Sequence, residues 1–86
     1  MPKIENTDLR RIPGIGKEME NRLIRLDYIS VASLKGQNPE SMYEADCRLN
    51  GGHIDRCVLY VYRLAVYFAE NEKHEPEKLK WWNWKN

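Results

Sequence analysis

The chain has 86 residues, of which 42% are hydrophobic and 31% charged, and its formal net charge is +1. This length fits one small domain over residues 1–86, and the apolar content excludes a disordered chain. The near-neutral charge excludes a protein that is basic over its whole surface. The sequence contains no membrane span and no secretory signal, so we expect a cytoplasmic protein whose two cysteines are thiols.

The first predicted element is a short helix over residues 7–12, preceded by a flexible arm over residues 1–6. Thr7 or Asp8 can cap this helix, and Pro13 prevents its continuation. A second helix follows the segment "PGIG". Its apolar side chains recur with the period of one helical face, and they are Met19, Leu23 and Leu26.

Two more helices are predicted in the middle of the chain. Ser30 can cap a short helix in "VASLK", which Gly36 ends as a left-handed stop. Asn38 can cap the next helix, in "QNPESMYEADCRLN", where Pro39 takes the first helical position. The "GG" that follows then breaks the chain.

The segment "RCVLYVYRLAVYFAE" follows Asp55, which can cap a helix. Its "VLYVY" core has strand propensity, but the segment is longer than a typical strand and contains no turn, so we predict a helix. A helix that is apolar on nearly all sides is central to its domain or lies at a subunit interface, which leaves a homodimer open. Arg63 within it should pair with an acid or reach the surface.

The C-terminal part consists of a polar linker over residues 71–80 and an aromatic tail over residues 81–86. Exposed tryptophans at this end would favour aggregation. We therefore expect Trp81, Trp82 and Trp84 to dock on the domain or on a partner subunit as an irregular segment. The alternative is a platform of aromatic and lysine side chains that stacks on nucleic-acid bases.

The turn "IPGIGK" joins the first two helices. Gly14 and Gly16 can adopt positive φ and let the backbone approach a partner closely. The next helix starts at about Lys17, and its first N–H groups have no partner inside the helix and lie at the positive end of its dipole. The turn is therefore a candidate phosphate-binding site, although it lacks the spacing of a nucleotide P-loop.

Four segments extend this signature along the chain: "LRRIPGIGKEM", "ASLKGQNPESMYEADC", "DRCVLYVYRLAVYFA" and "KLKWWNWK". Together they closely resemble a family of small bacterial helix-hairpin-helix proteins, labelled pathogenicity-locus or mitomycin-resistance-like, over roughly residues 7–86. The resemblance implies an all-α, SAM-like five-helix domain with an N-terminal helix-hairpin-helix motif. It also implies sequence-independent binding to the DNA backbone.

Residue by residue, the resemblance places the backbone N–H groups around the turn against a phosphate and the Ile15 side chain between the two helices. The DNA phosphate-binding residues it implies are Gly14, Ile15, Gly16, Lys17, Arg10 and Arg11. Glu20 stands where the motif usually has a small residue, and Glu18 stands where many DNA-binding members have a basic or neutral one.

Two functional hypotheses follow. The first is a non-enzymatic domain that binds DNA weakly and without sequence preference through the hairpin over residues 13–17. The second is a protein-interaction module on the same scaffold that does not touch DNA. The "PGIG" turn favours DNA, and so do the first 35 residues, which contain seven Lys or Arg against five acids. The near-neutral net charge of the whole chain favours a protein partner.

Other chemistry is less well supported. Cys47, His53 and Cys57 do not have a common zinc spacing and lack a fourth ligand, so buried thiols are favoured over a third hypothesis, a thiol or metal site at the two cysteines. The carboxylates of Glu18 and Glu20 fit a solvated helix face. With no Ser, His and acid cluster, we predict no catalytic residue and no cofactor.

Overall fold

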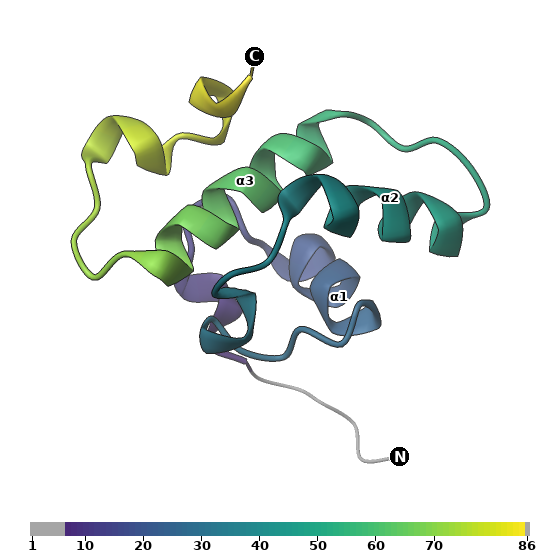
Figure 1. The fold of residues 1–86 in the computed structure, drawn as a ribbon, viewed down its shortest axis with the longest axis horizontal. Helices are drawn as coiled ribbons and strands as arrows, with labels where there is room; N and C mark the ends of the chain where they lie inside the picture. Colours follow the sequence, from purple (N-terminus) through teal and green to yellow (C-terminus); the bar gives the residue numbers. More distant parts are fainter. Residues whose placement is uncertain (1–6, 86) are drawn as a thin grey trace.

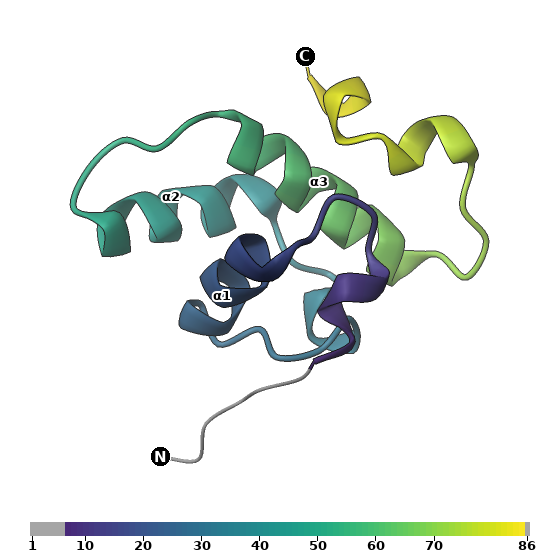
Figure 2. The ribbon, with the colours of Figure 1, turned by 180° about the vertical axis from the view of Figure 1, so that it is seen from behind.

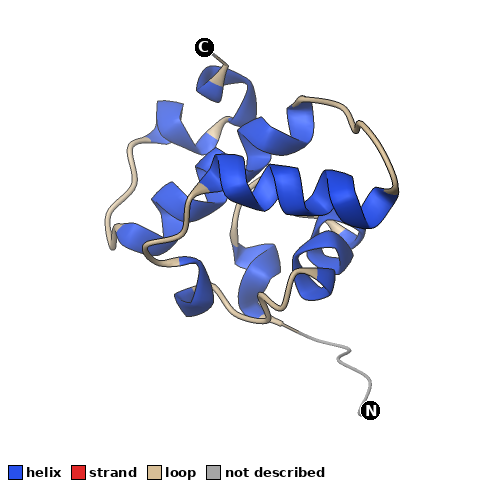
Figure 3. Ribbon diagram, turned by 45° about the vertical axis from the view of Figure 1, so that its right-hand side comes forward, coloured by secondary structure: helices blue, strands red, loops and turns tan. Residues whose placement is uncertain are grey.

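The computed structural model describes residues 7–85, and this part of the chain is helical without strands (Figures 1 and 3). The prediction of an all-α fold is therefore confirmed for these residues. The α-helices are α1 (Lys17–Arg25), α2 (Pro39–Asn50) and α3 (Cys57–Glu70). The shorter 3-10 helices are η1 (Asp8–Arg11), η2 (Ala32–Leu34), η3 (Pro76–Leu79) and η4 (Trp81–Trp84). The arm predicted over residues 1–6 lies outside the described residues.

Helix α3 is the centre of the fold, and α2, η2 and η4 pack against it. Its length and burial confirm the prediction of an apolar helix in place of a strand. The buried side chains of α3 are Leu59, Val61, Tyr62, Leu64, Ala65, Val66 and Ala69. Seen from behind, the connection between η1 and α1 crosses α3 (Figure 2). A Cβ placed on Gly14 in this connection would lie 3.9 Å from the Leu64 side chain, so the turn contacts the central helix directly.

Local signals in the sequence account for the ends of the helices. The Asn38 side chain accepts hydrogen bonds from the N–H groups of Glu40 and Ser41, so it caps α2 as predicted. Gly51 ends α2 at φ +79°, a left-handed conformation that favours glycine. None of the helices formed by residues 7–85 has the length and apolar content that a membrane crossing requires.

A buried polar network joins the three α-helices. The Asp46 side chain is almost fully buried and accepts from Arg22 Nη1, at 3.2 Å to each carboxylate oxygen, and from the Tyr62 hydroxyl at 2.5 Å. Burial, together with the Asp46 carboxylate, raises the pKa of Tyr62 far above its usual value, so its hydroxyl stays a donor. Each partner comes from a different helix, and the network therefore fixes how the helices sit relative to one another.

Arg63 makes a second connection, at the surface. It forms an ion pair with Glu40 in the first turn of α2 at 3.1 Å, and its Nη1 donates to the Trp84 carbonyl oxygen at 2.7 Å. The prediction that Arg63 pairs with an acid is confirmed. This guanidinium thus links α2, α3 and η4. It can do so because it is planar and has several N–H donors.

Candidate nucleic-acid interface

The hairpin over residues 13–17 is built on a tight turn. The N–H of Ile15 donates to the Ile12 carbonyl oxygen at 3.1 Å, with Pro13 and Gly14 at the two central positions. Gly14 has φ +87°, which is the conformation a turn with proline before it requires and which side chains disfavour. The Ile15 side chain is buried in the core, which anchors the turn to the domain.

Gly16 has a different role from the one predicted. Its φ of −98° and ψ of −168° are extended values that any residue adopts, so the expectation of positive φ is wrong at this position. Gly16 instead caps α1, where its carbonyl oxygen accepts the first helical hydrogen bond from Glu20 at 2.9 Å. A Cβ on Gly16 would meet nothing within 4 Å. The space in front of it is therefore open to a partner.

The start of α1 presents a row of backbone donors. Among residues 7–85, no acceptor bonds the N–H groups of Gly16, Lys17, Glu18 and Met19. The first three of these residues are exposed. Their N–H groups lie at the positive end of the helix dipole. This geometry matches the requirements of a phosphate oxygen, which accepts several hydrogen bonds and has a negative charge.

The basic residues near the hairpin differ in whether a carboxylate already pairs with them. Lys17 is exposed and forms no ion pair with the described residues. Arg11 is also exposed and lies 3.9 Å from Asp8. Arg10 differs, because its Nε donates to a buried carboxylate, that of Glu20, at 3.0 Å. The resemblance grouped all three as phosphate contacts; of the three, Arg10 is engaged most closely by a carboxylate, whereas Lys17 has no such partner among the described residues.

Glu20 does not lie on a solvated face, so that expectation is wrong. It is 4% exposed and accepts from the Thr7 hydroxyl at 2.6 Å and from Arg10. The Thr7 hydrogen bond, with Arg10 beside it, holds the pKa of Glu20 below its usual value although burial opposes this. The carboxylate that departs from the motif therefore fastens η1 to α1. Glu18, by contrast, is solvated and sits 3.8 Å from Arg22.

Comparison with known families identifies a match over nearly the whole chain. The family model described as Cdd1, pathogenicity locus, matches residues 3–86. The chain belongs to this family. No curated protein and no solved structure shows significant similarity to it. The match supports the pathogenicity-locus part of the resemblance, and its label names neither a hairpin motif nor mitomycin resistance.

In this Cdd1 family member the aromatic tail reaches the hairpin. The Trp81 ring lies 3.5 Å from the position that a Cβ on Gly14 would take. Trp84 packs beside Tyr67 of α3, with ring centroids 5.4 Å apart, whereas Trp82 is 51% exposed. The stretch over residues 71–80 is also more ordered than the word linker implies, because it includes η3. No local pattern in the sequence signals the contact between Gly14 and Trp81.

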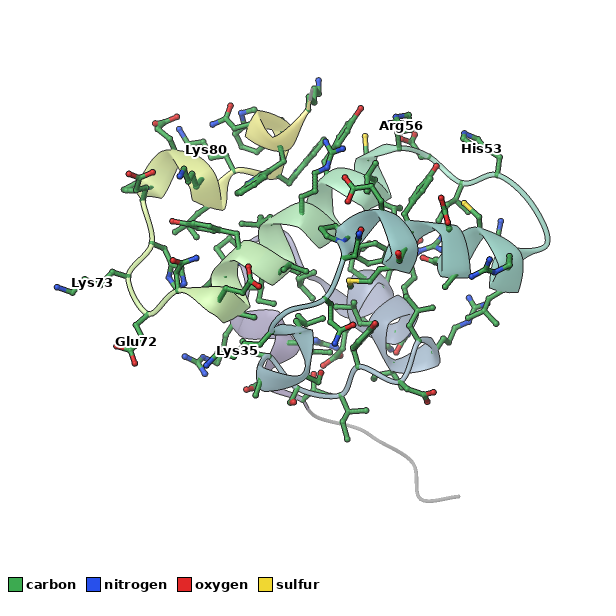
Figure 4. The ribbon with its side chains drawn as sticks, viewed as in Figure 1. Lys35, His53, Arg56, Glu72, Lys73 and Lys80 are labelled. Atoms are coloured by element: carbon green, nitrogen blue, oxygen red, sulfur yellow. The ribbon has the colours of Figure 1, made fainter. Side chains whose placement is uncertain are left out.

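The two cysteines are free and partly buried, less buried than expected. The Asp55 carboxylate accepts from the Cys57 N–H at 2.8 Å, and its hydrogen bond to the thiol raises the pKa of Cys57. Such a thiol is not activated as a nucleophile. Figure 4 places His53 at the opposite end of the molecule from Lys73, the neighbour of His74. Residues 7–85 contain no group of three His, Cys, Asp or Glu that could hold a metal ion.

Proposed function

We propose that this protein is a non-enzymatic, DNA-associated domain that binds the phosphate backbone through the 13–17 hairpin, used as a helix-hairpin-helix motif within a SAM-like domain. The observation that supports this best is the row of unbonded N–H groups from Gly16 to Met19 at the exposed start of α1. Phosphate oxygens would accept these hydrogen bonds, and Lys17 would add a positive charge beside them.

The strength and selectivity of this binding follow from the size of the site. One helix start contacts few phosphates, so the affinity should be weak and the salt dependence shallow, on the order of two to four released counterions. Phosphate contacts do not report base identity, so unrelated sequences should bind alike. Glu18 is exposed beside the donors and opposes an anion, which lowers the affinity further.

The buried Glu20 has a supporting part in this proposal. Its hydrogen bonds to Thr7 and Arg10 hold η1 against α1. They therefore set the angle at which the hairpin presents its N–H groups, because η1 and α1 are the two arms of that hairpin. An arm that is fixed before binding loses less conformational entropy when the ligand arrives.

The test is a pair of glycine variants. Gly16 and Gly52 are both exposed, have no positive φ and leave open space for a Cβ, so they are matched positions for a substitution by valine. Gly16→Val places a branched side chain in front of the backbone N–H donors at the start of α1. It should abolish duplex binding, measured by fluorescence anisotropy at low salt. Gly52→Val, in the α2–α3 connection, should bind like the parent. Equal binding by both variants would show that the hairpin only joins two helices.

A protein-interaction module is the second candidate. Its support is an open cavity of about 350 Å³ between the end of α1 and the face of α2. The cavity is lined by Leu26, Tyr28, Gly36, Gln37, Asn38, Ser41, Met42 and Ala45. This candidate predicts no salt-dependent binding to duplex DNA by the parent, which the same titration measures. The thiol or metal hypothesis at Cys47 and Cys57 has no comparable support, because the pKa of Cys57 is raised.

A further inference from the structure

The aromatic tail presents one tryptophan to solvent beside the hairpin. Trp81 contacts Gly14 in the turn, and the Trp82 ring stands edge-on to Trp81, with centroids 5.7 Å apart and an interplanar angle of 87°. Trp82 thus lies one aromatic ring away from the turn. It is 51% exposed, while its two neighbouring tryptophans are partly buried.

The backbone on either side of Trp82 is held in place. The Asn83 side chain donates to the Glu77 carbonyl oxygen at 2.8 Å, and its N–H donates to the Lys80 carbonyl oxygen at 3.0 Å. Trp84 Nε1 donates to the Lys78 carbonyl oxygen at 2.8 Å. The exposed indole is therefore presented on an ordered turn, which lowers the entropy lost when a ligand stacks on it.

We infer that Trp82 is a stacking site for an unpaired nucleic-acid base, next to the phosphates held by the hairpin. The inference rests on the proposed function. It specifies the form of DNA that the protein should prefer, which is a duplex with a single-stranded extension. Because Trp81 contacts the turn at Gly14 and Trp82 stands against Trp81, a strand held at the hairpin would have its next unpaired bases near Trp82.

The surroundings of Trp82 favour a base over an apolar protein surface. The other large exposed apolar side chains among residues 7–85 are Ile29 and Leu49, which belong to the α1–η2 connection and to α2, not to the tail. Lys85 near Trp82 is exposed, and Lys80 on the η3–η4 connection pairs with Glu77 at 3.2 Å (Figure 4). A single exposed indole face with an exposed lysine three residues away suits stacking on a base of a polyanion, which tolerates any sequence.

The test compares a blunt duplex with the same duplex bearing a single-stranded extension of thymidines, titrated by fluorescence anisotropy. The parent should bind the extended duplex about tenfold more tightly, in line with stacking on one base. Trp82→Ala should remove this preference and leave binding to the blunt duplex unchanged. Trp82→Phe, which keeps an aromatic face, should retain most of it. Leu49→Ala is the matched control, because Leu49 has the same exposed fraction and lies on α2, and it should behave like the parent.

A second measurement separates this inference from the proposed function. Oligothymidine should quench the tryptophan emission of the parent and of Gly16→Val, but not that of Trp82→Ala. Blunt-duplex binding that survives in Gly16→Val overturns the proposed function alone. Equal affinity of the parent for both duplexes, or quenching that persists in Trp82→Ala, overturns the stacking site alone. A change from dimer to monomer in Trp82→Ala, without any effect on DNA, would assign the ring to a protein interface and also overturn it.

Discussion

At the scale of single residues, Glu20 shows how one side chain can oppose a motif and still support the local structure. Its position in the sequence, among charged residues at the start of α1, is typical of a solvated carboxylate. In the fold it is 4% exposed and bonded to Thr7 and Arg10. A buried carboxylate remains ionised only when hydrogen-bond donors and a cation surround it, and these two residues supply both.

This environment makes part of the stability depend on pH. Because the pKa of Glu20 is lowered in the folded state, its contribution is present above the unfolded value of about 4.5 and is lost as the pH falls through the lower folded value. We expect Glu20→Gln to reduce the free energy of unfolding at pH 7 by about 1–3 kcal/mol. Below pH 4.5, the free energy of unfolding of this variant, measured by urea denaturation, should depend less on pH than that of the parent.

Glu18→Gln is the matched control, because Glu18 is two positions earlier in α1 and solvated. It should change neither the stability nor its acid dependence measurably. The pKa of Asp55 is also lowered, so this residue contributes to the loss of stability at acid pH in the parent and in both variants. It therefore does not alter the comparison between them. An acid profile of Glu20→Gln that superimposes on the parent's would refute the assigned role of the carboxylate.

At the scale of elements, the aromatic tail is unusual because its order comes from contacts outside it. The 3-10 helix η4 is too short to be stable alone. Trp84 packs beside Tyr67, bonds the Lys78 carbonyl oxygen through Nε1, and accepts from Arg63 through its own carbonyl oxygen. Its two neighbours in η4 differ from each other, since Trp81 contacts the hairpin and Trp82 is exposed.

These differences predict unequal effects of alanine substitution. Trp84→Ala removes a partly buried ring and an indole hydrogen bond, so we expect a loss of about 2–3 kcal/mol in the free energy of unfolding. Trp82→Ala removes a largely solvated ring and should cost less than about 1 kcal/mol. Thermal denaturation followed by circular dichroism measures both. Similar melting temperatures for the two variants would mean that Trp84 does not anchor the tail.

At the scale of the whole molecule, the network of Arg22, Asp46 and Tyr62 ties α1, α2 and α3 together in the core. A small domain has little apolar surface to bury, so a satisfied polar network at its centre has a large effect on which arrangement of helices is adopted. Removing Asp46 leaves the fully buried Tyr62 hydroxyl without its acceptor and takes the closer of two carboxylates from the partly buried Arg22, which is costly.

We therefore expect Asp46→Ala to be the most destabilising single change described, by about 3–5 kcal/mol, enough to unfold a domain of ordinary stability. Glu44→Ala, two positions earlier on α2 at an exposed site, should stay within about 0.5 kcal/mol of the parent. Urea denaturation at pH 7 distinguishes them. A mild effect of Asp46→Ala would indicate that water or another side chain replaces the carboxylate.

The sequence alone determined the three α-helices, η1, η2 and several of their ends, for local physical reasons, but not η3 or η4, which lie in the segments predicted as a linker and an irregular tail. Caps such as Asn38 and left-handed glycines such as Gly51 act within a few residues, and the length of the apolar run around Arg63 excluded a strand. The hairpin was likewise visible, since Pro13 and Gly14 define a turn that depends only on local backbone conformation.

The tertiary structure alone decided which side chains meet. Glu20 is buried because Thr7 and Arg10 fold back onto it, and Asp46 is buried because Arg22 and Tyr62 arrive from other helices. The contact of Trp81 with the turn, and hence the exposure of Trp82 beside the hairpin, joins residues that are far apart in the chain. Such contacts depend on how whole helices pack, which no pattern within one segment encodes.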